Sequence, residues 1–208
     1  MSGSFDTRWQ GSGNEPISKR IRSAVSPPKP LKPRLEAAQK MLQQQILKMD
    51  KESERFNERD KTLFAKVVDS YQKHDTQRAN IYANELSELR KMAKMTINAK
   101  LALDQIQMRL EATSELGDIA YTLLPVIGVV RDIRNGMASV NPQIARELGD
   151  ISNILSGIVM DAGVTSGLNL SFSQMNSEAQ QIMQEAAVVA ERRMQDTFPE
   201  LPGKIPLK

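Results

Sequence analysis

Few side chains in this sequence could do covalent or metal chemistry. The chain has no cysteine and one histidine, His74. A catalytic or metal-binding histidine acts together with a base or further ligands, so we interpret this isolated one as a surface residue of a turn. No glycine-rich phosphate loop and no nucleophile beside a base can be identified. The sequence therefore predicts a protein that is not an enzyme and that holds no cofactor or metal.

The most specific binding chemistry lies at the C-terminal end, in residues 197–208. Apolar side chains there stand beside prolines, which favour an extended strand and limit the entropy that docking costs. Such a strand can place successive apolar side chains in a groove between helices of a partner. The residues predicted to bind in this way are Phe198, Pro199, Leu201, Pro202, Ile205 and Pro206.

A second candidate binding segment is the N-terminal arm, residues 1–33, which is rich in Ser, Gly and Pro and is predicted to be disordered. Aromatic and aliphatic side chains recur there at helical spacing beside three cations, which suits the surface of an anionic bilayer. The predicted membrane-binding residues are Phe5, Trp9, Ile17, Lys19, Arg20, Ile21 and Arg22. The alternative is a disordered arm without this role. No continuous apolar core of a signal peptide follows the first charges.

Long amphipathic helices must position these two ends. Apolar residues recur every seven positions from 35 to 63, and the same spacing returns from 82 to 110 with Thr96 as its one polar member. This is the spacing of a packing seam between helices. We expect one helix from Arg34 or Leu35 to about Ser70, and a second that Asp75 caps and that runs to at least Leu116. The predicted packing residues are Leu35, Leu42, Met49, Phe56, Leu63, Leu89, Leu103 and Leu110, with Met108 in support.

Shorter helices are expected after the hairpin. Residues 119–130 carry no charge, but this run is shorter than the roughly 20 residues of a membrane span, so we interpret it as part of a hinge-bearing helix. Pro142 should begin the next helix, and residues 163–173 should form a flexible linker. Ser177 with Gln180 has the spacing of a capping box for a last helix whose apolar positions include Val189.

The predicted fold class is therefore all-α, with four parts. Residues 1–33 form the membrane-targeting arm, 34–140 the hairpin and hinge helix, 141–196 an acidic regulatory region, and 197–208 the tail. Charge is unevenly distributed along the chain, since residues 1–111 carry a net charge of +7 and residues 112–208 a net charge of −4. The basic part could bind an anionic surface that the acidic part shields. The outer side of the first helix should carry a solvated mixture of charges, Asp60 among them.

The basic hairpin, the acidic helices and the tail together resemble ESCRT-III proteins of the Snf7 superfamily, in particular the archaeal cell-division CdvB group. The tail is similar to the type-2 motif that binds the MIT domain of an AAA+ disassembly ATPase, and Phe198, Pro199, Leu201 and Pro202 match the core of that motif. The resemblance implies a filament of this protein and paralogous ESCRT-III subunits, which constricts and severs the membrane from its inner, cytoplasmic face at the division site. Only 12 residues follow Asp196, so it also implies a short paralogue without the winged-helix extension of some members.

Two other classes share parts of this pattern. A phage-shock-type coiled coil of the membrane-stress response would have the same hairpin, but it does not call for the Phe-Pro-x-Leu-Pro tail. A basic coiled coil that binds nucleic acid would fit the sequence pI of about 9.1. However, the charges of residues 36–111 nearly cancel, with 14 basic against 12 acidic side chains, which leaves little net charge to bind a phosphate backbone. Nucleic acid is therefore not an expected partner.

Overall fold

Two long helices, α2 (Leu31–Gln72) and α3 (Thr76–Ala112), run side by side as an antiparallel hairpin. The computed structural model describes residues 30–112, 119–166 and 172–199, and each regular element in these ranges is a helix. The predicted all-α class is therefore confirmed. At about 1.5 Å per residue, the 42 residues of α2 span about 63 Å.

The seam between α2 and α3 is built from the positions that recur every seven residues. Seven of the eight predicted packing residues are buried, and Phe56 is half-buried at the point where the hairpin also meets the last helix. Met108 is an exception because its side chain is 61% exposed. Ile106 is buried in its place, and two residues along an α-helix correspond to a rotation of about 200°. The prediction that Met108 supports the seam was therefore wrong.

The turn between the two helices is set by local backbone chemistry. His74 has a φ of 58°, its N–H donates to the carbonyl of Tyr71, and the N–H of Asp75 donates to the carbonyl of Ser70. This is the Schellman pattern that ends many helices. The Asp75 carboxylate then accepts a hydrogen bond of 3.0 Å from the N–H of Arg78 and caps α3, as predicted.

Two predicted helix starts were too late. Helix α2 begins at Leu31, one turn before the predicted Arg34, because the first N–H groups of a helix have no intrahelical partner and Pro33 therefore costs no hydrogen bond there. Helix α6 (Phe172–Thr197) begins five residues before the predicted cap Ser177, since no glycine or proline interrupts residues 172–177. The linker predicted at residues 163–173 is shorter, because its neighbours are helical up to Ser166 and from Phe172.

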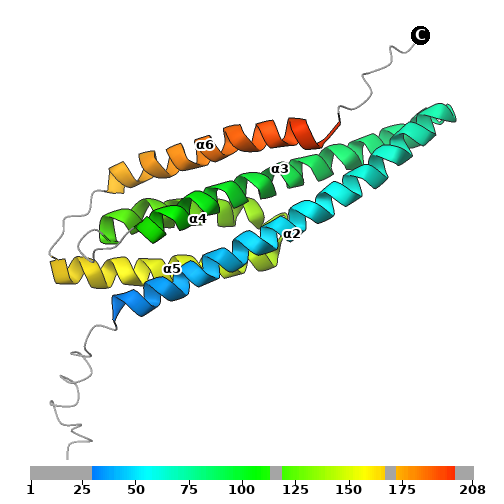
Figure 1. Ribbon diagram of the computed structural model, residues 1–208. Helices are drawn as coiled ribbons and strands as arrows, with labels where there is room; N and C mark the ends of the chain where they lie inside the picture. Colours follow the sequence, from blue (N-terminus) through cyan, green and yellow to red (C-terminus); the bar gives the residue numbers. More distant parts are fainter. Residues whose placement is uncertain (1–29, 113–118, 167–171, 200–208) are drawn as a thin grey trace, which may run out of the picture.

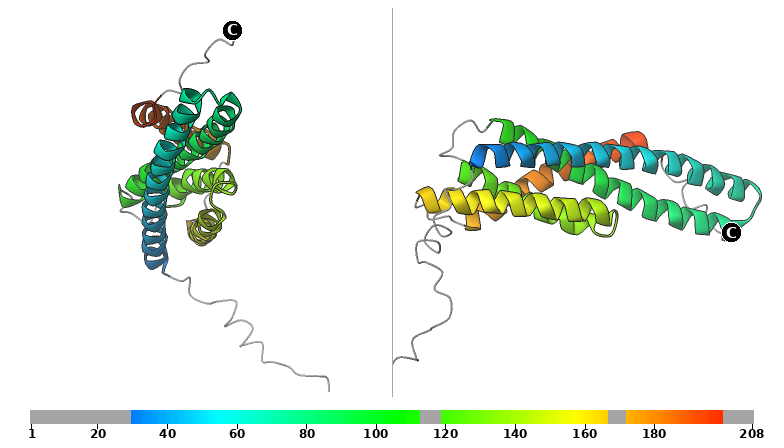
Figure 2. Two further views of the ribbon diagram at one scale, coloured as in Figure 1. Left: turned by 90° about the vertical axis from the view of Figure 1, so that its right-hand side faces the viewer. Right: turned by 90° about the horizontal axis from the view of Figure 1, so that it is seen from below.

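Three further helices cover one half of the hairpin. Helix α4 (Ile119–Met137), with Pro125 inside it, pairs with α5 (Pro142–Ser166). Asn141 caps α5 by accepting hydrogen bonds from the N–H groups of Gln143 and Ile144. Helix α5 lies along the first half of α2 and α6 along α3, while the end of the hairpin that carries the turn projects beyond all three (Figures 1 and 2).

One large apolar core joins the covered half of the hairpin to α4, α5 and α6. Helix α6 contributes Ala179, Ile182 and Ala186, whereas Val189, predicted on its apolar side, is 44% exposed. Helix α5 contributes Ile144, Leu148, Ile151, Leu155 and Ile158, with Ile154 half-buried. The end of the hairpin beyond these helices has a separate, smaller cluster made by α2 and α3 alone.

The close approach of α4 and α6 makes Gly128 a sensitive position. A Cβ added there would lie 3.1 Å from the Cβ of Ala179, whereas a Cβ at Gly136 of the same helix meets nothing within 4 Å. We expect Gly128→Val to lower the free energy of unfolding by about 1 to 3 kcal/mol more than Gly136→Val, because overpacking forces α6 away from α4. Chemical denaturation of both variants measures the difference. Equal stabilities would show that α6 does not pack on α4 at this point.

Candidate functional site

The surface between the basic hairpin and the acidic helices is the most extensive candidate site. Among the described residues, four ion pairs cross it, and in each of them the hairpin supplies the cation and α5 or α6 supplies the carboxylate. The pairs are Arg34 with Asp161, Lys48 with Glu147, Lys94 with Glu191 and, at 3.6 Å, Arg109 with Glu178. The opposite net charges of the hairpin and of the C-terminal helices are thus paired with each other across this surface.

The contact between α2 and α5 is the most elaborate of these. Glu147 accepts hydrogen bonds from Lys48, from Gln45 at 2.6 Å and from Gln143 at 3.1 Å. The hydrogen bond from Lys48 lowers the pKa of Glu147 below 4.5, with burial opposing this and the two glutamines assisting. Gln45 is itself buried in the seam, so this carboxylate reaches from α5 to the edge of the hairpin core.

A glycine allows the other contact between α2 and α5. The guanidinium of Arg34 crosses α5 at Gly157, where an added Cβ would lie 2.5 Å from Nη2 of the arginine. From there Arg34 pairs with Asp161, one turn further along α5. The first turn of α2 is in this way bound to the last part of α5 that the structure describes in full.

The tail begins on the hairpin. Phe198 is only 8% exposed and packs with Ala93 and Ile97 of α3 and with Ala190 of α6. Its ring faces Arg90, whose Cζ lies 5.6 Å from the ring centroid. The structure therefore places the first residue of the predicted partner-binding motif in contact with this chain's own helices.

Asp60 and Arg90 are residues whose role the sequence analysis missed. Asp60, predicted on the solvated side of the first helix, is buried, and its carboxylate accepts two hydrogen bonds from the guanidinium of Arg90, at 2.6 and 3.1 Å. That prediction was wrong because the position belongs to the seam. The available signal was its register, since Asp60 stands four residues after Phe56 and three before Leu63.

Most other predicted site residues lie outside the described residues. Pro199 is described and exposed. The remainder of the tail set, Leu201, Pro202, Ile205 and Pro206, falls outside the described ranges, as does the whole membrane set of Phe5, Trp9, Ile17, Lys19, Arg20, Ile21 and Arg22.

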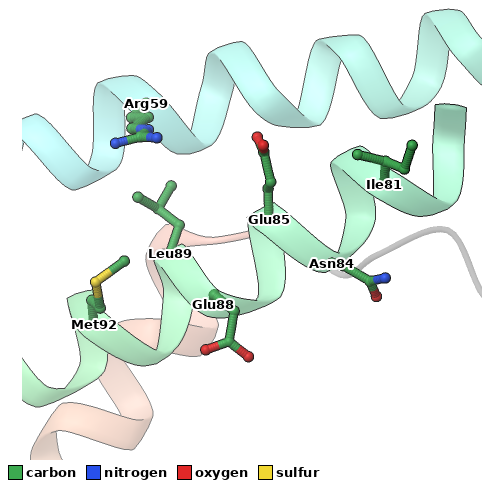
Figure 3. Close-up of a pocket in the computed structure, with 7 residues that line it drawn as sticks. All are labelled: Arg59, Ile81, Asn84, Glu85, Glu88, Leu89 and Met92. Atoms are coloured by element: carbon green, nitrogen blue, oxygen red, sulfur yellow. The ribbon is translucent and has the colours of Figure 1, made fainter.

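A groove between α2 and α3 lies toward the projecting end of the hairpin (Figure 3). Glu85 and Leu89 point from α3 toward α2, which contributes Arg59, whereas Glu88 points away. Within the described ranges, no His, Asp and Glu side chains gather as a group that could hold a metal ion. None of the described helices combines the length and apolar character that crossing a bilayer requires.

The lowered pKa of Glu147 predicts a pH dependence of the contact between α2 and α5. Its contribution should be complete above pH 4.5 and lost as the pH falls below that value, through the lower pKa of the folded state. Thermal unfolding should therefore show that the free energy of unfolding of wild type falls by up to about 1 kcal/mol more between pH 6 and pH 3 than that of Glu147→Gln. Asp150→Asn, at an exposed position of α5, is the matched control. Parallel pH curves for wild type and Glu147→Gln would exclude this contact in solution.

Known proteins place the chain in a family. It is 40% identical over 203 residues to cell division protein B1 of Sulfolobus acidocaldarius, an alignment that covers 98% of this chain and 92% of the relative. It is 33% identical over 161 residues to cell division protein B of the same organism, covering 77% of this chain and 62% of that longer relative. No family model and no solved structure matches. With 40% identity over nearly its whole length to one of these relatives and 33% identity over about three quarters of it to the other, the chain belongs to the cell division protein B (CdvB) group of archaeal proteins.

Proposed function

We propose that this protein acts in archaeal cell division as an ESCRT-III-like subunit, which polymerises on the inner face of the cell membrane and helps to constrict and sever it. Its similarity to cell division proteins B1 and B supports the process. The observation that carries the mechanism is the one-sided arrangement of ion pairs, in which acidic helices cover a basic hairpin. We interpret the described arrangement as the closed, soluble form of the subunit.

The closed form is built to be reversible. Exposed ion pairs contribute about 0 to 1 kcal/mol each and are weakened by salt, so an anionic surface that competes for Lys48, Lys94 and Arg109 can displace the carboxylates. Release of α5 and α6 exposes these three cations together with the apolar side of α3. A neighbouring subunit, either a second copy or a paralogue, would cover that apolar side in the filament.

Membrane contact is assigned to the N-terminal arm. This arm precedes α2, and the first turn of α2 is the part that Arg34 ties to α5. Opening of α5 would therefore free the end of the hairpin next to the arm. The arm's aromatic side chains and cations suit an anionic bilayer, where each basic residue near the surface contributes about 1 kcal/mol.

Disassembly of the filament is assigned to the tail, which would bind the MIT domain of an AAA+ ATPase. An extended strand of this length buries little surface, so we expect a dissociation constant in the micromolar range, about −7 to −8 kcal/mol. Many tails displayed along one filament would raise the effective affinity by avidity.

The membrane assignment is tested with vesicles. The full chain should pellet with anionic liposomes and form filaments visible by negative-stain electron microscopy. Deleting residues 1–25 should weaken pelleting by at least about tenfold, because several basic residues and both aromatic anchors are lost. Helical content measured by circular dichroism should stay nearly unchanged.

Two controls separate charge from apolar insertion in that experiment. Replacing Lys19, Arg20 and Arg22 by Gln should weaken binding to anionic vesicles, and neutral vesicles should bind all forms poorly. Equal pelleting of full and truncated chains on anionic vesicles would refute the assignment of the arm, and the absence of filaments under every condition would refute the proposed function.

The ATPase assignment is tested with a labelled peptide of residues 194–208. Replacing Leu201 and Ile205 together by Asp should abolish its binding to the MIT domain in a fluorescence titration, because a charged side chain cannot enter an apolar pocket without a large desolvation cost. Lys204→Gln lies between these positions and should bind like wild type. If the doubly substituted peptide binds equally well, the tail does not recruit the ATPase.

A further inference from the structure

Arg90 connects the hairpin to the tail through three different contacts. Its guanidinium donates two hydrogen bonds to the Asp60 carboxylate, donates a third of 2.7 Å to the carbonyl oxygen of Pro199, and lies against the ring of Phe198. A guanidinium suits this task because its planar fork can pair with a carboxylate while its face stacks on an aromatic ring.

The pair of Asp60 and Arg90 is placed for recognition more than for stability. The Asp60 side chain is 2% exposed and that of Arg90 is 15% exposed, and a buried ion pair contributes little net stability compared with apolar residues in the same space. What it adds is a fixed orientation. Because Asp60 holds two N–H groups of Arg90, a further N–H and one face of the guanidinium are directed at the position that Phe198 and Pro199 occupy.

Apolar side chains complete this position. Phe198 belongs to one apolar cluster with Ala93 and Ile97 of α3 and Ala190 of α6, and the half-buried Phe56 of α2 packs against this cluster. The neighbouring residues Asp50, Ser53 and Asn57 line the cleft at its edge. An aromatic side chain followed by a residue with a free carbonyl fits both the apolar and the polar parts of this surface.

We propose that Asp60, Arg90 and the apolar side chains beside them form a seat for the Phe198-Pro199 segment, and that the seat withholds this segment from the partner of the tail. The identity of that partner, an ATPase domain, rests on the proposed function. The seat itself rests on the contacts that Arg90 makes with Asp60, Phe198 and Pro199. Helix α6 leads directly into this segment. When α6 leaves the hairpin, it therefore releases the tail as well.

The seat has a quantitative consequence. A partner that binds only the released tail binds the full chain more weakly than it binds a free tail. Its apparent dissociation constant equals that of the free tail divided by the fraction of molecules whose tail is released. The isolated peptide of residues 194–208 contains none of the seat, so it should bind the partner more tightly than the full chain does. Weakening the seat should bring the full chain toward the affinity of the peptide.

The first test measures the seat without any partner. The chain has no cysteine, so nitroxide labels on Lys61→Cys and Thr197→Cys, both at exposed positions, report the distance between α2 and the end of α6 by pulsed electron spin resonance. We expect one narrow distance population in the parent chain and a broad one after Arg90→Ala. Arg90→Lys, which keeps the charge opposite Asp60 but loses the fork, should also broaden it.

The matched control is Lys91→Ala, which removes the adjacent exposed cation of α3 and its pairing with Glu88 of the same helix. It should leave the distance population narrow. Narrow distance populations in both Arg90 variants would overturn the seat. Circular dichroism checks whether Arg90→Ala keeps its helical content, and if it does not, Arg90→Lys is the deciding variant.

The second test measures binding of the MIT domain to the full chain. Arg90→Lys should bind at least about tenfold more tightly than wild type, which corresponds to 1.4 kcal/mol, and Lys91→Ala should bind like wild type. Equal affinities for wild type, Arg90→Lys and the peptide would refute the withholding of the tail. If neither the chain nor the peptide binds the domain while the Arg90 variants still release the tail, the seat stands and the assigned partner is wrong.

Discussion

The structure depends on one constraint, which is that a two-helix hairpin cannot bury all of its own apolar surface. Near its projecting end, α2 and α3 pack only on each other, and the aromatic residues Phe64, Tyr71 and Tyr82 stay partly exposed. In the other half, α3 buries Ala99, Ala102, Leu103 and Ile106 in a core that needs α4, α5 and α6 to be complete. The hairpin therefore requires a cover, which its own C-terminal half or another molecule can supply.

Electrostatics makes that cover reversible and directional. Apolar burial supplies attraction without regard to orientation, while the ion pairs between basic hairpin and acidic helices fix which surfaces meet. Because those pairs are partly exposed, an anionic membrane can compete for the same cations. The contacts of Asp60 and Arg90 with Phe198 and Pro199 extend the closed form to the start of the tail. In the proposed mechanism, membrane contact, subunit contact and access to the tail therefore depend on a single rearrangement.

Those parts of the fold that depend on residues close together in the sequence could be predicted from the sequence. The seven-residue spacing predicted the hairpin, and Asp75 and Pro142 marked helix starts through their own backbone chemistry. Ser177 misled because the spacing of a capping box also occurs inside helices. The register of Asp60 between Phe56 and Leu63 was a local signal for its place in the seam. Its pairing with Arg90 could not be predicted, because that residue comes from the opposite helix. The docking of Phe198 likewise depends on contacts between residues more than a hundred positions apart.

The central claim is that the acidic helices cover the hairpin in the soluble protein and leave it in the assembled one. It is tested most directly by the distance between nitroxide labels at two exposed positions, Gln44 on α2 and Arg146 on α5, introduced as cysteines. These helices pack together in the structure, so the soluble protein should give a short, narrow distance population. Filaments diluted with unlabelled protein on anionic liposomes should give a longer one. An unchanged short distance in those filaments would contradict the account.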